Sequence, residues 1–295
     1  MQLNLFKLER MLNDSSAHPA LGLQLPMPER EREYSPSSAI GGNYAPFIQA
    51  YKDLSQAAHA ALPHRRTLRY GDLPRQQIDY FAAPDSSAQK GLLVFIHGGY
   101  WQELSKDESA FLAPAWHAAG FAHAVMGYTL APQASVRQIV HECVSAVTHL
   151  REQAKTLGFD ASRIVVAGSS AGGYLAAAVA AHTELKIRGI VPISGVFDLR
   201  PLVGTSINDA LSLTLEEAQE LSALASQVRI PAVIAWGEIE TSAFIAQSQM
   251  LAAQLNAAQH AVQSMELAGR NHFDVVHELG DAQSSLFQAT LHLFE

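Results

Sequence analysis

The sequence has a single cysteine, Cys143, so no internal disulfide can form and the composition is typical of a reducing compartment. Its neighbours at helical spacing are apolar, which indicates a buried structural thiol. Charged residues make up only 16% of the chain, the formal net charge is −8, and no run of Lys or Arg is long enough to bind a polyanion. We therefore expect no nucleic acid and no acidic membrane surface as a partner, and favour a small substrate of little charge.

Long apolar runs are also absent, because no stretch approaches the roughly 20 residues that a membrane span requires. Polar residues interrupt residues 1–10 before any apolar segment of a signal peptide appears. These absences predict a cytoplasmic protein. Apolar residues are nevertheless 48% of the chain, which is ample for a large core, and 295 residues fit one α/β domain with an embellishment.

Short apolar runs alternate with amphipathic stretches over most of the chain. Continuous apolar runs are typical of strands buried on both faces of a parallel sheet, and they occur at 92–96, 121–126, 164–167, 190–193 and 232–236. Helices are expected between them, at 106–119, 136–157, 171–182 and 242–258. The alternation predicts an α/β fold, with a mostly parallel, doubly wound sheet and helices on both faces.

Two regions fall outside this alternation. Residues 1–62 contain several prolines and a Gly-Gly pair before a helical stretch near 46–61, so we expect an N-terminal arm packed on a body that spans 63–295. Residues 197–228 lie between two predicted strands and are rich in Leu, Ser and Glu, which indicates a helical insertion. Insertions at the carboxyl ends of sheet strands commonly cover a pocket, so this one is a candidate lid.

A candidate nucleophile follows the predicted strand at 164–167. The segment Gly168-Ser169-Ser170-Ala171-Gly172-Gly173 leads directly into a predicted helix and fits the pattern G-x-S-x-G. A serine on so sharp a turn needs glycines two positions before and after it, and its hydroxyl then stands at a helix N-terminus that favours negative charge. The context predicts that Ser170 is a catalytic nucleophile and that Ser169 is a bystander.

A glycine-rich loop, His97-Gly98-Gly99-Tyr100-Trp101, follows the predicted strand at 92–96. In hydrolases with such a serine, the loop after this strand supplies backbone N–H groups to the oxyanion hole. We predict that the amides of Gly98, Gly99 and Ala171 form this hole. Tyr100 and Trp101 are candidates for substrate contact, whereas His97 is interpreted as a histidine that braces the loop.

The general base of such enzymes follows the serine and the acid in chain order. A predicted strand at 261–267 is followed by Ala268-Gly269-Arg270-Asn271-His272-Phe273-Asp274 and then by a C-terminal helix. His272 is therefore the predicted base, since its loop would bring it beside Ser170. Other late histidines lie in or beside helices or near the terminus, where surface positions are expected.

The acid is expected after the strand at 232–236, where Gly237-Glu238-Ile239-Glu240-Thr241 offers two carboxylates. A carboxylate holds the imidazole tautomer and stabilises the imidazolium. Glu240 is the prediction, Glu238 is the alternative, and Asp198 is a third candidate that we interpret as a helix cap.

The motifs named above, together with Ile193-Ser194-Gly195-Val196-Phe197-Asp198-Leu199, resemble the arylformamidase (kynurenine formamidase) branch of the hormone-sensitive-lipase-like α/β hydrolases. The similarity runs from about Tyr34 to the C-terminus, and the Tyr-Trp and His-Phe-Asp segments are its more discriminating parts. In that family the acid lies in a segment similar to 240–244, which supports Glu240. The resemblance implies an α/β-hydrolase fold and hydrolysis of an N-formyl aryl amide such as N-formylkynurenine.

The predicted function is therefore hydrolysis of an N-formyl, or other short N-acyl, aryl amine through an acyl-enzyme, with a broad carboxylesterase on short-chain or aryl esters as the alternative. A ligand receptor that has abandoned catalysis would be expected to lack His272. A metal-dependent amidase is disfavoured, because His141-Glu142 has Ser145 where a second ligand is needed. We expect no cofactor and no metal, and a homodimer is retained as one option for the oligomeric state.

Overall fold

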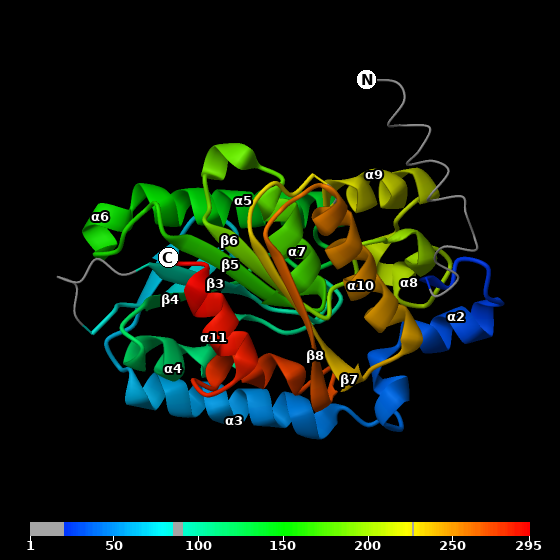
Figure 1. Cartoon of the computed structure of the whole chain (residues 1–295), viewed down its shortest axis with the longest axis horizontal. Helices are drawn as coiled ribbons and strands as arrows, with labels where there is room; N and C mark the ends of the chain where they lie inside the picture. Colours follow the sequence, from blue (N-terminus) through cyan, green and yellow to red (C-terminus); the bar gives the residue numbers. More distant parts are fainter. Residues whose placement is uncertain (1–20, 85–90, 226) are drawn as a thin grey trace.

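The structure is a computed structural model that describes residues 21–84, 91–225 and 227–295 (Figure 1). Within those residues, eight strands form one sheet in the order β1-β2-β4-β3-β5-β6-β7-β8. Their bounds are β1 Arg66–Arg69, β2 Gln77–Phe81, β3 Leu92–Ile96, β4 Ala122–Met126, β5 Ile164–Ser169, β6 Gly189–Ile193, β7 Ala232–Ile239 and β8 Val262–Asn271. Strands β3 to β8 are parallel, and β1 and β2 pair antiparallel. The predicted, mostly parallel sheet is confirmed.

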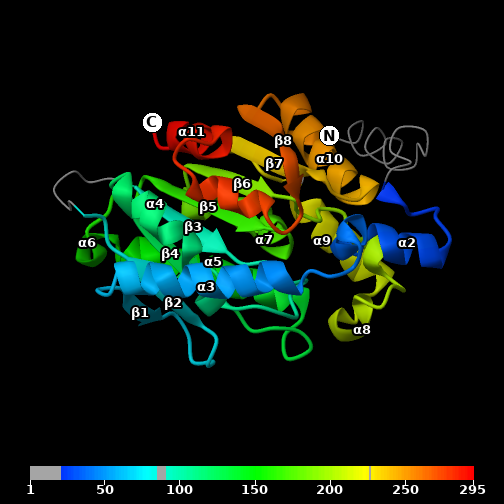
Figure 2. The same cartoon turned by 90° about the horizontal axis from the view of Figure 1, so that it is seen from below.

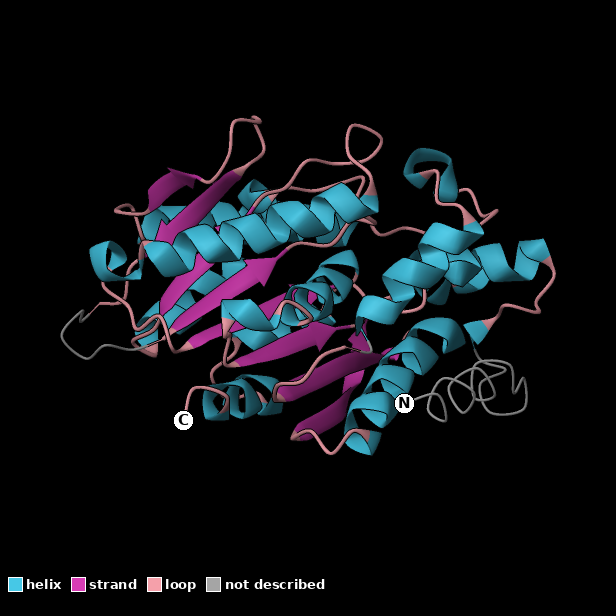
Figure 3. Cartoon of the chain, turned by 90° about the horizontal axis from the view of Figure 1, so that it is seen from above, coloured by secondary structure: helices cyan, strands magenta, loops and turns pink. Residues whose placement is uncertain are grey.

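Helices cover both faces of this sheet (Figures 2 and 3). One face carries α5 (Val136–Glu152), α6 (Ala154–Leu157), α7 (Ala171–Ala180), α9 (Leu215–Ala225) and α10 (Ser242–Ala257). The other carries α3 (Ala45–Ala61), α4 (Ala113–Ala118) and α11 (Ser285–His292). The shorter α2 (Met27–Glu33) and α8 (Asn208–Leu211) lie together at one end of the molecule. Of the helices in the described ranges, none is both long and apolar enough to cross a membrane.

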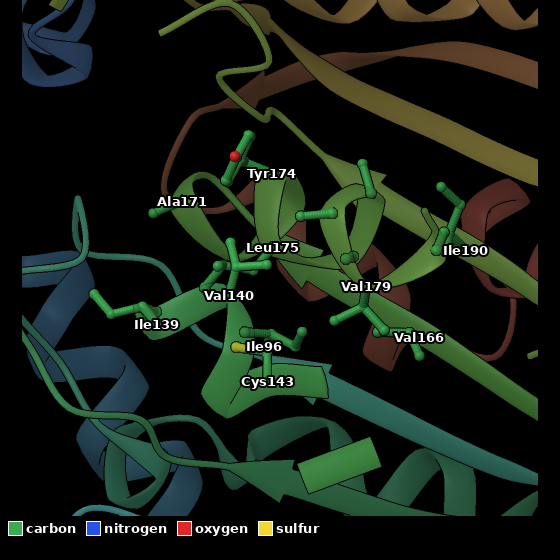
Figure 4. Packing of buried hydrophobic residues seen from close by; sticks show 14 of the residues in the cluster. Ile96, Ile139, Val140, Cys143, Val166, Ala171, Tyr174, Leu175, Val179 and Ile190 are labelled. Carbon is green, nitrogen blue, oxygen red and sulfur yellow. The ribbon is translucent and has the colours of Figure 1, made fainter. Parts of the chain in front are cut away.

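Alternation along each central strand divides the interior into two cores. In β3, Leu92, Val94 and Ile96 face α5 and α7, while Leu93 and Phe95 face α3 and α4. Figure 4 shows the first core, in which side chains of α5 and α7 meet those of β3, β5 and β6. Cys143 is buried there as a free thiol, which confirms the predicted structural role. Burial raises the pKa of this thiol well above its ordinary value.

Some predicted elements differ from the observed ones. The helix expected at 106–119 is instead η4 (Lys106–Glu108), η5 (Ala110–Leu112) and α4. Pro114 explains where α4 begins, because proline lacks an N–H and is tolerated only in the first turn of a helix. Strands β1 and β2 are absent from the sequence-based prediction. Strand β1 is mostly exposed and rich in arginine, and β2 carries Asp79 at its centre, so neither shows a continuous apolar run.

The buried carboxylate of Asp79 holds the antiparallel edge of the sheet to α3 and η4. Its side chain is fully buried, and it accepts a hydrogen bond from Thr67 at 2.7 Å. Lys106 Nζ lies 3.1 Å from Asp79 Oδ2, and Arg65 Nε and His59 Nε2 lie at 3.6 and 3.9 Å from the same oxygen. A buried carboxylate is stable only with such partners, which accounts for an aspartate inside a strand.

The N-terminal segment, residues 21–61 of the described chain, contacts several elements of the body. Glu31 accepts hydrogen bonds from the backbone and hydroxyl of Ser206 in the insertion, and the Glu33 carboxylate accepts one from the Ala243 backbone at 3.1 Å. On α3, Ser55 Oγ accepts a hydrogen bond from Ala110 N at 3.0 Å. The predicted arm at 1–62 extends into residues 1–20, which lie outside the described ranges, and the domain division at 62/63 stays a prediction.

We expect Asp79→Ala to lower the free energy of unfolding by about 3 kcal/mol, because Lys106 and Arg65 would lose their buried partner. Urea unfolding measures this change. The matched control is Asp107→Ala, whose exposed carboxylate pairs with the same lysine and should change stability by less than about 1 kcal/mol. Equal effects of the two substitutions would contradict the role given to the buried carboxylate.

Candidate active site

Ser170 lies on a tight turn between the carboxyl end of β5 and the N-terminus of α7. Its backbone has φ 56° and ψ −121°, a conformation that costs a residue with a side chain on the order of 1–3 kcal/mol. Backbone hydrogen bonds hold it there: Ser170 N donates to Ile193 O at 2.8 Å, and Ser170 O accepts from Gly173 N at 2.9 Å and from Tyr174 N at 3.2 Å. The strained conformation is therefore fixed by the sheet and by the first turn of the helix.

The glycines of the motif are required by the space around the turn. A Cβ atom at Gly168 would lie 2.1 Å from the carbonyl oxygen of Gly172, and one at Gly172 would lie 2.0 Å from that of Ile96. Real Cβ contacts are never this short. Both positions expected to need glycine therefore leave no room for a side chain.

The loop after β3 lies directly against Ser170. A Cβ atom at Gly98 would meet the Ser169 carbonyl oxygen at 2.8 Å and the Ser170 Cβ at 3.1 Å. Gly99 has φ 94°, and a Cβ there would lie 2.4 Å from the Glu103 carbonyl oxygen. The loop can approach the serine this closely only because Gly98 lacks a side chain, and the absence of one at Gly99 allows the turn toward Glu103. Gly98, Gly99 and Ser170 line one cavity, and Ala171 follows as the first residue of α7.

His97 supports this loop. Its ring stacks on Tyr128 with centroids 4.2 Å apart, and its Nδ1 lies 2.9 Å from the Gly98 carbonyl oxygen. Tyr128 also donates from its hydroxyl to the His97 carbonyl oxygen at 3.0 Å. Burial lowers the pKa of His97 to about 4, so the ring is neutral near pH 7 and Nδ1 is the donor toward Gly98. These contacts agree with the expected bracing role.

The imidazole of His272 is paired with a buried carboxylate. His272 Nδ1 lies 2.9 Å from Glu240 Oε2, and the side chains are 5% and 0% exposed. The other carboxylate oxygen, Oε1, accepts from Ser194 Oγ and from Gly237 N, both at 2.6 Å. The carboxylate thus orients the ring through Nδ1, which leaves Nε2 for a second partner.

The two alternative acids have other partners. Glu238 is exposed, and its carboxylate accepts a hydrogen bond from Gly269 N at 2.7 Å, which braces the end of β8. Asp198 accepts from the Arg200 backbone at 3.0 Å and forms an ion pair with the Arg200 side chain. The N-cap residue of η7 (Arg200–Leu202) is Leu199 and no side chain caps this helix, so the expected helix-cap role of Asp198 is not confirmed. Of the three candidate acids, Glu240 is thus the one that contacts His272.

Ser170 and His272 both line a cavity of about 240 Å³. Its lining includes the aromatic residues Tyr44, Tyr51, Phe95, Phe111 and Phe273. Polar residues also line it, among them Ser35, Ser37, Gln102 and Glu103. The N-terminal segment supplies residues 35–37, 44, 48 and 51, whereas residues 197–228 supply Ile207 to this lining. The N-terminal segment therefore contributes more residues to the cavity lining than the insertion does. The role of residues 197–228 as a lid stays a prediction.

The two aromatic residues after Gly99 differ in position. Tyr100 lines the cavity, and its hydroxyl donates to the Tyr34 carbonyl oxygen at 2.5 Å. Trp101 is 0% exposed, lies outside the cavity lining and packs edge-on against Tyr174, with ring centroids 5.6 Å apart. Trp101 is thus a core residue outside the lining of this cavity, which is evidence against the expected contact with substrate, and the expected contact of Tyr100 stays a prediction.

Two residues that contribute to the site are not among those predicted from the sequence. Ser194 is in the segment 193–199 of the family resemblance, where the sequence assigns it no role, and it donates to Glu240. Tyr51 lies on α3, where Tyr44, Ile48 and Tyr51 recur at helical spacing and all line the cavity. That apolar and aromatic spacing was the available signal, but it is equally typical of ordinary core packing. Among the described residues, no group of three His, Cys, Asp or Glu side chains could hold a metal ion.

The chain is similar to known proteins over most of its length. The chain is 28% identical over 271 residues to a kynurenine formamidase of Danio rerio, which covers 86% of this chain and 91% of the relative. It is also 28% identical to a kynurenine formamidase of Drosophila melanogaster, over 75% of this chain and 79% of the relative. The family resemblance seen in the sequence is thereby confirmed.

Solved structures share the fold. A candidate thioesterase from Silicibacter sp. superposes with a TM-score of 0.77 at 28% identity, covering 87% of this chain and 96% of that chain. An esterase from Pyrobaculum calidifontis superposes with a TM-score of 0.68 at 17% identity, covering 84% and 90%, and shows the shared α/β-hydrolase fold. The BD-FAE family model matches residues 78–255, from β2 to the end of α10. The chain therefore belongs to the BD-FAE family and is a hydrolase of the α/β-hydrolase superfamily.

Proposed function

We propose that this protein is a serine hydrolase that removes a formyl or other short acyl group from an aromatic amine. The proposal is carried by one arrangement: the buried His272–Glu240 pair, Ser170 and the glycine loop meet at a single cavity. In this proposal Ser170 is the nucleophile, His272 the general base and Glu240 the acid that stabilises the imidazolium. The amides of Gly98, Gly99 and Ala171 are the oxyanion donors.

Acylation begins as the Ser170 hydroxyl oxygen attacks the formyl carbon while His272 Nε2 takes the hydroxyl proton. The carbonyl oxygen becomes an oxyanion beside the glycine loop and the N-terminus of α7, where backbone N–H groups and the helix dipole stabilise negative charge. His272 then returns the proton to the amide nitrogen, the carbon–nitrogen bond breaks, and the arylamine leaves. The product of this half-reaction is a formyl ester on Ser170.

Deacylation repeats these steps with water. His272 takes a proton from a water molecule as the water oxygen attacks the ester carbon, and a second tetrahedral oxyanion forms. When this intermediate collapses, the proton on His272 passes to the Ser170 oxygen and formic acid leaves, which then loses its own proton to water as formate. The enzyme regains its starting state, and no cofactor enters the balance.

The cavity supports an aromatic substrate. Aromatic side chains are prominent in its lining, and an aryl ring buried against them gains both apolar burial and ring stacking. On the loop side, the Tyr100 hydroxyl is fixed by its bond to Tyr34, which restricts space beside Gly99. The relatives named kynurenine formamidase act on an arylformamide, and their similarity over most of the chain supports the same substrate class here.

A carboxylesterase acting on short-chain or aryl esters is the second candidate. The same serine, base and oxyanion donors cleave esters, and Esterase LipC of Mycobacterium tuberculosis is 31% identical over 40% of this chain. A cytoplasmic location and a homodimer both stay predictions.

The first test concerns the nucleophile. We expect Ser170→Ala to abolish hydrolysis and covalent labelling by a fluorophosphonate probe, because the attacking hydroxyl is removed. Mass spectrometry of the labelled peptide identifies the modified residue. Ser169→Ala, the adjacent control, should still be labelled at position 170. Labelling that persists in Ser170→Ala would refute the assignment.

The second test concerns the acid. Glu240→Gln keeps the side-chain shape but removes the charge that stabilises the imidazolium, so we expect kcat to fall by roughly 10³- to 10⁴-fold. Glu238→Gln is the matched control, since it removes the neighbouring carboxylate that binds Gly269. The kcat of Glu238→Gln should stay within about twofold of that of the unmodified enzyme, because removing an exposed charge usually has a small energetic effect. A larger loss in Glu238→Gln than in Glu240→Gln would reverse the assignment.

The third test separates the two candidate functions. We expect kcat/KM to fall from formyl to acetyl to butyryl anilides, by more than about 10-fold per step, because each longer acyl chain must enter the space beside Tyr100. Steady-state kinetics with matched anilides and phenyl esters measures the series. A clear preference for butyryl esters over formyl anilides would favour the carboxylesterase.

A further inference from the structure

We propose that Tyr51 on α3 is a positioning residue for His272, acting through the loop 271–274. The inference rests on the proposed function, since it takes His272 to be the base. Residues 51 and 273 lie 222 positions apart in the chain, yet the Tyr51 hydroxyl donates a hydrogen bond to the Phe273 carbonyl oxygen, immediately after His272. The N-terminal segment therefore contacts the loop that carries the base.

Aromatic stacking strengthens this contact. The Phe273 ring stacks on Tyr44 with centroids 5.3 Å apart and planes 9° apart, and on Phe47 at 5.6 Å and 26°. Phe273 also packs edge-on against the His272 ring, at 5.4 Å and 80°. Through Phe273, α3 therefore restricts both the backbone and the ring beside the base.

Hydrogen bonds inside the loop 271–274 fix the conformation of the turn. They do not fix the position of the turn relative to Ser170. Asn271 N donates to Asp274 Oδ1 at 2.7 Å, and Phe273 N donates to Asn271 Oδ1 at 2.9 Å. Both bonds join residues of the same loop. The position of the whole turn relative to β5 depends on its outside contacts, and the bond from Tyr51 is one of these.

Tyr51 is itself held rigidly. It is 8% exposed, and its ring stacks on Phe111 at 5.1 Å and meets His277 edge-on at 5.5 Å. Burial raises the pKa of Tyr51, with a smaller contribution from Asp274, so the phenol keeps its proton and remains a donor. A fixed donor can hold the loop in the narrow range of positions in which Nε2 faces the serine, and a misplacement of about 1 Å can cost about 100-fold in rate.

The experiment removes only the donor, by Tyr51→Phe in the full chain. We expect the rate of fluorophosphonate labelling of Ser170 and kcat for a formyl anilide to fall about 10-fold, while KM changes less than about twofold.

The control is Ser55→Ala, one turn further along α3. It removes a buried hydrogen bond between α3 and Ala110 without touching the loop 271–274. This variant should lose stability, as measured by thermal unfolding, but keep the labelling rate and the kcat of the unmodified enzyme. If it reproduces the changes seen in Tyr51→Phe, the effect is one of stability and the positioning role is wrong.

A second variant covers the case in which Tyr51→Phe does not fold. Phe47→Leu removes a ring that stacks on Phe273 and lies outside the cavity lining, and labelling should slow about threefold, with KM changed less than about twofold. A labelling rate in Tyr51→Phe equal to that of the unmodified enzyme overturns this inference alone. Failure of the unmodified enzyme to label at Ser170 overturns the proposed function instead.

Discussion

A carboxylate that is fully removed from solvent holds the candidate site together. Glu240 would be unstable as an isolated buried charge, and it is compensated by hydrogen bonds from Ser194, Gly237 and His272. Ser194 directly follows β6, Gly237 is in β7, and His272 directly follows β8. Because these strands are adjacent and parallel, their carboxyl ends meet at one edge, and the sheet itself builds the pair.

Strain at Ser170 depends on the same sheet. The residue is held in an unfavourable backbone conformation by a bond to Ile193, the last residue of β6, and by the first turn of α7. Its surroundings are packed so closely that Gly98, Gly168 and Gly172 have no space for a Cβ atom. The packing of the strands and of the buried helix α7 offsets the free-energy cost of the strained backbone at Ser170. This packing keeps the Ser170 side chain in the lining of the cavity.

Both ends of the described chain contribute to the site. Residues 35–51 form part of the cavity wall, and Tyr51 contacts Phe273, the residue after His272. Just before this segment, the carbonyl oxygens of Glu33 and Tyr34 accept hydrogen bonds from Thr241 and Tyr100. The family model covers residues 78–255 and so omits both this segment and His272. The cavity is thus completed by parts of the chain outside the core that the family match recognises.

The sequence by itself determined the parallel strands and the serine turn, because continuous apolar runs and paired glycines have few other physical solutions. The sequence also pointed to His272 as the candidate base, because it follows the last predicted strand. For the candidate acid it favoured two nearby glutamates, Glu238 and Glu240. Side-chain direction decided the rest. Glu240 rather than Glu238 turns inward after an irregularity in the β7–β8 pairing, and Trp101 turns into the core while Tyr100 faces the cavity. Contacts across 222 residues, such as Tyr51 with Phe273, leave no local pattern in the chain, so only the tertiary structure could show them.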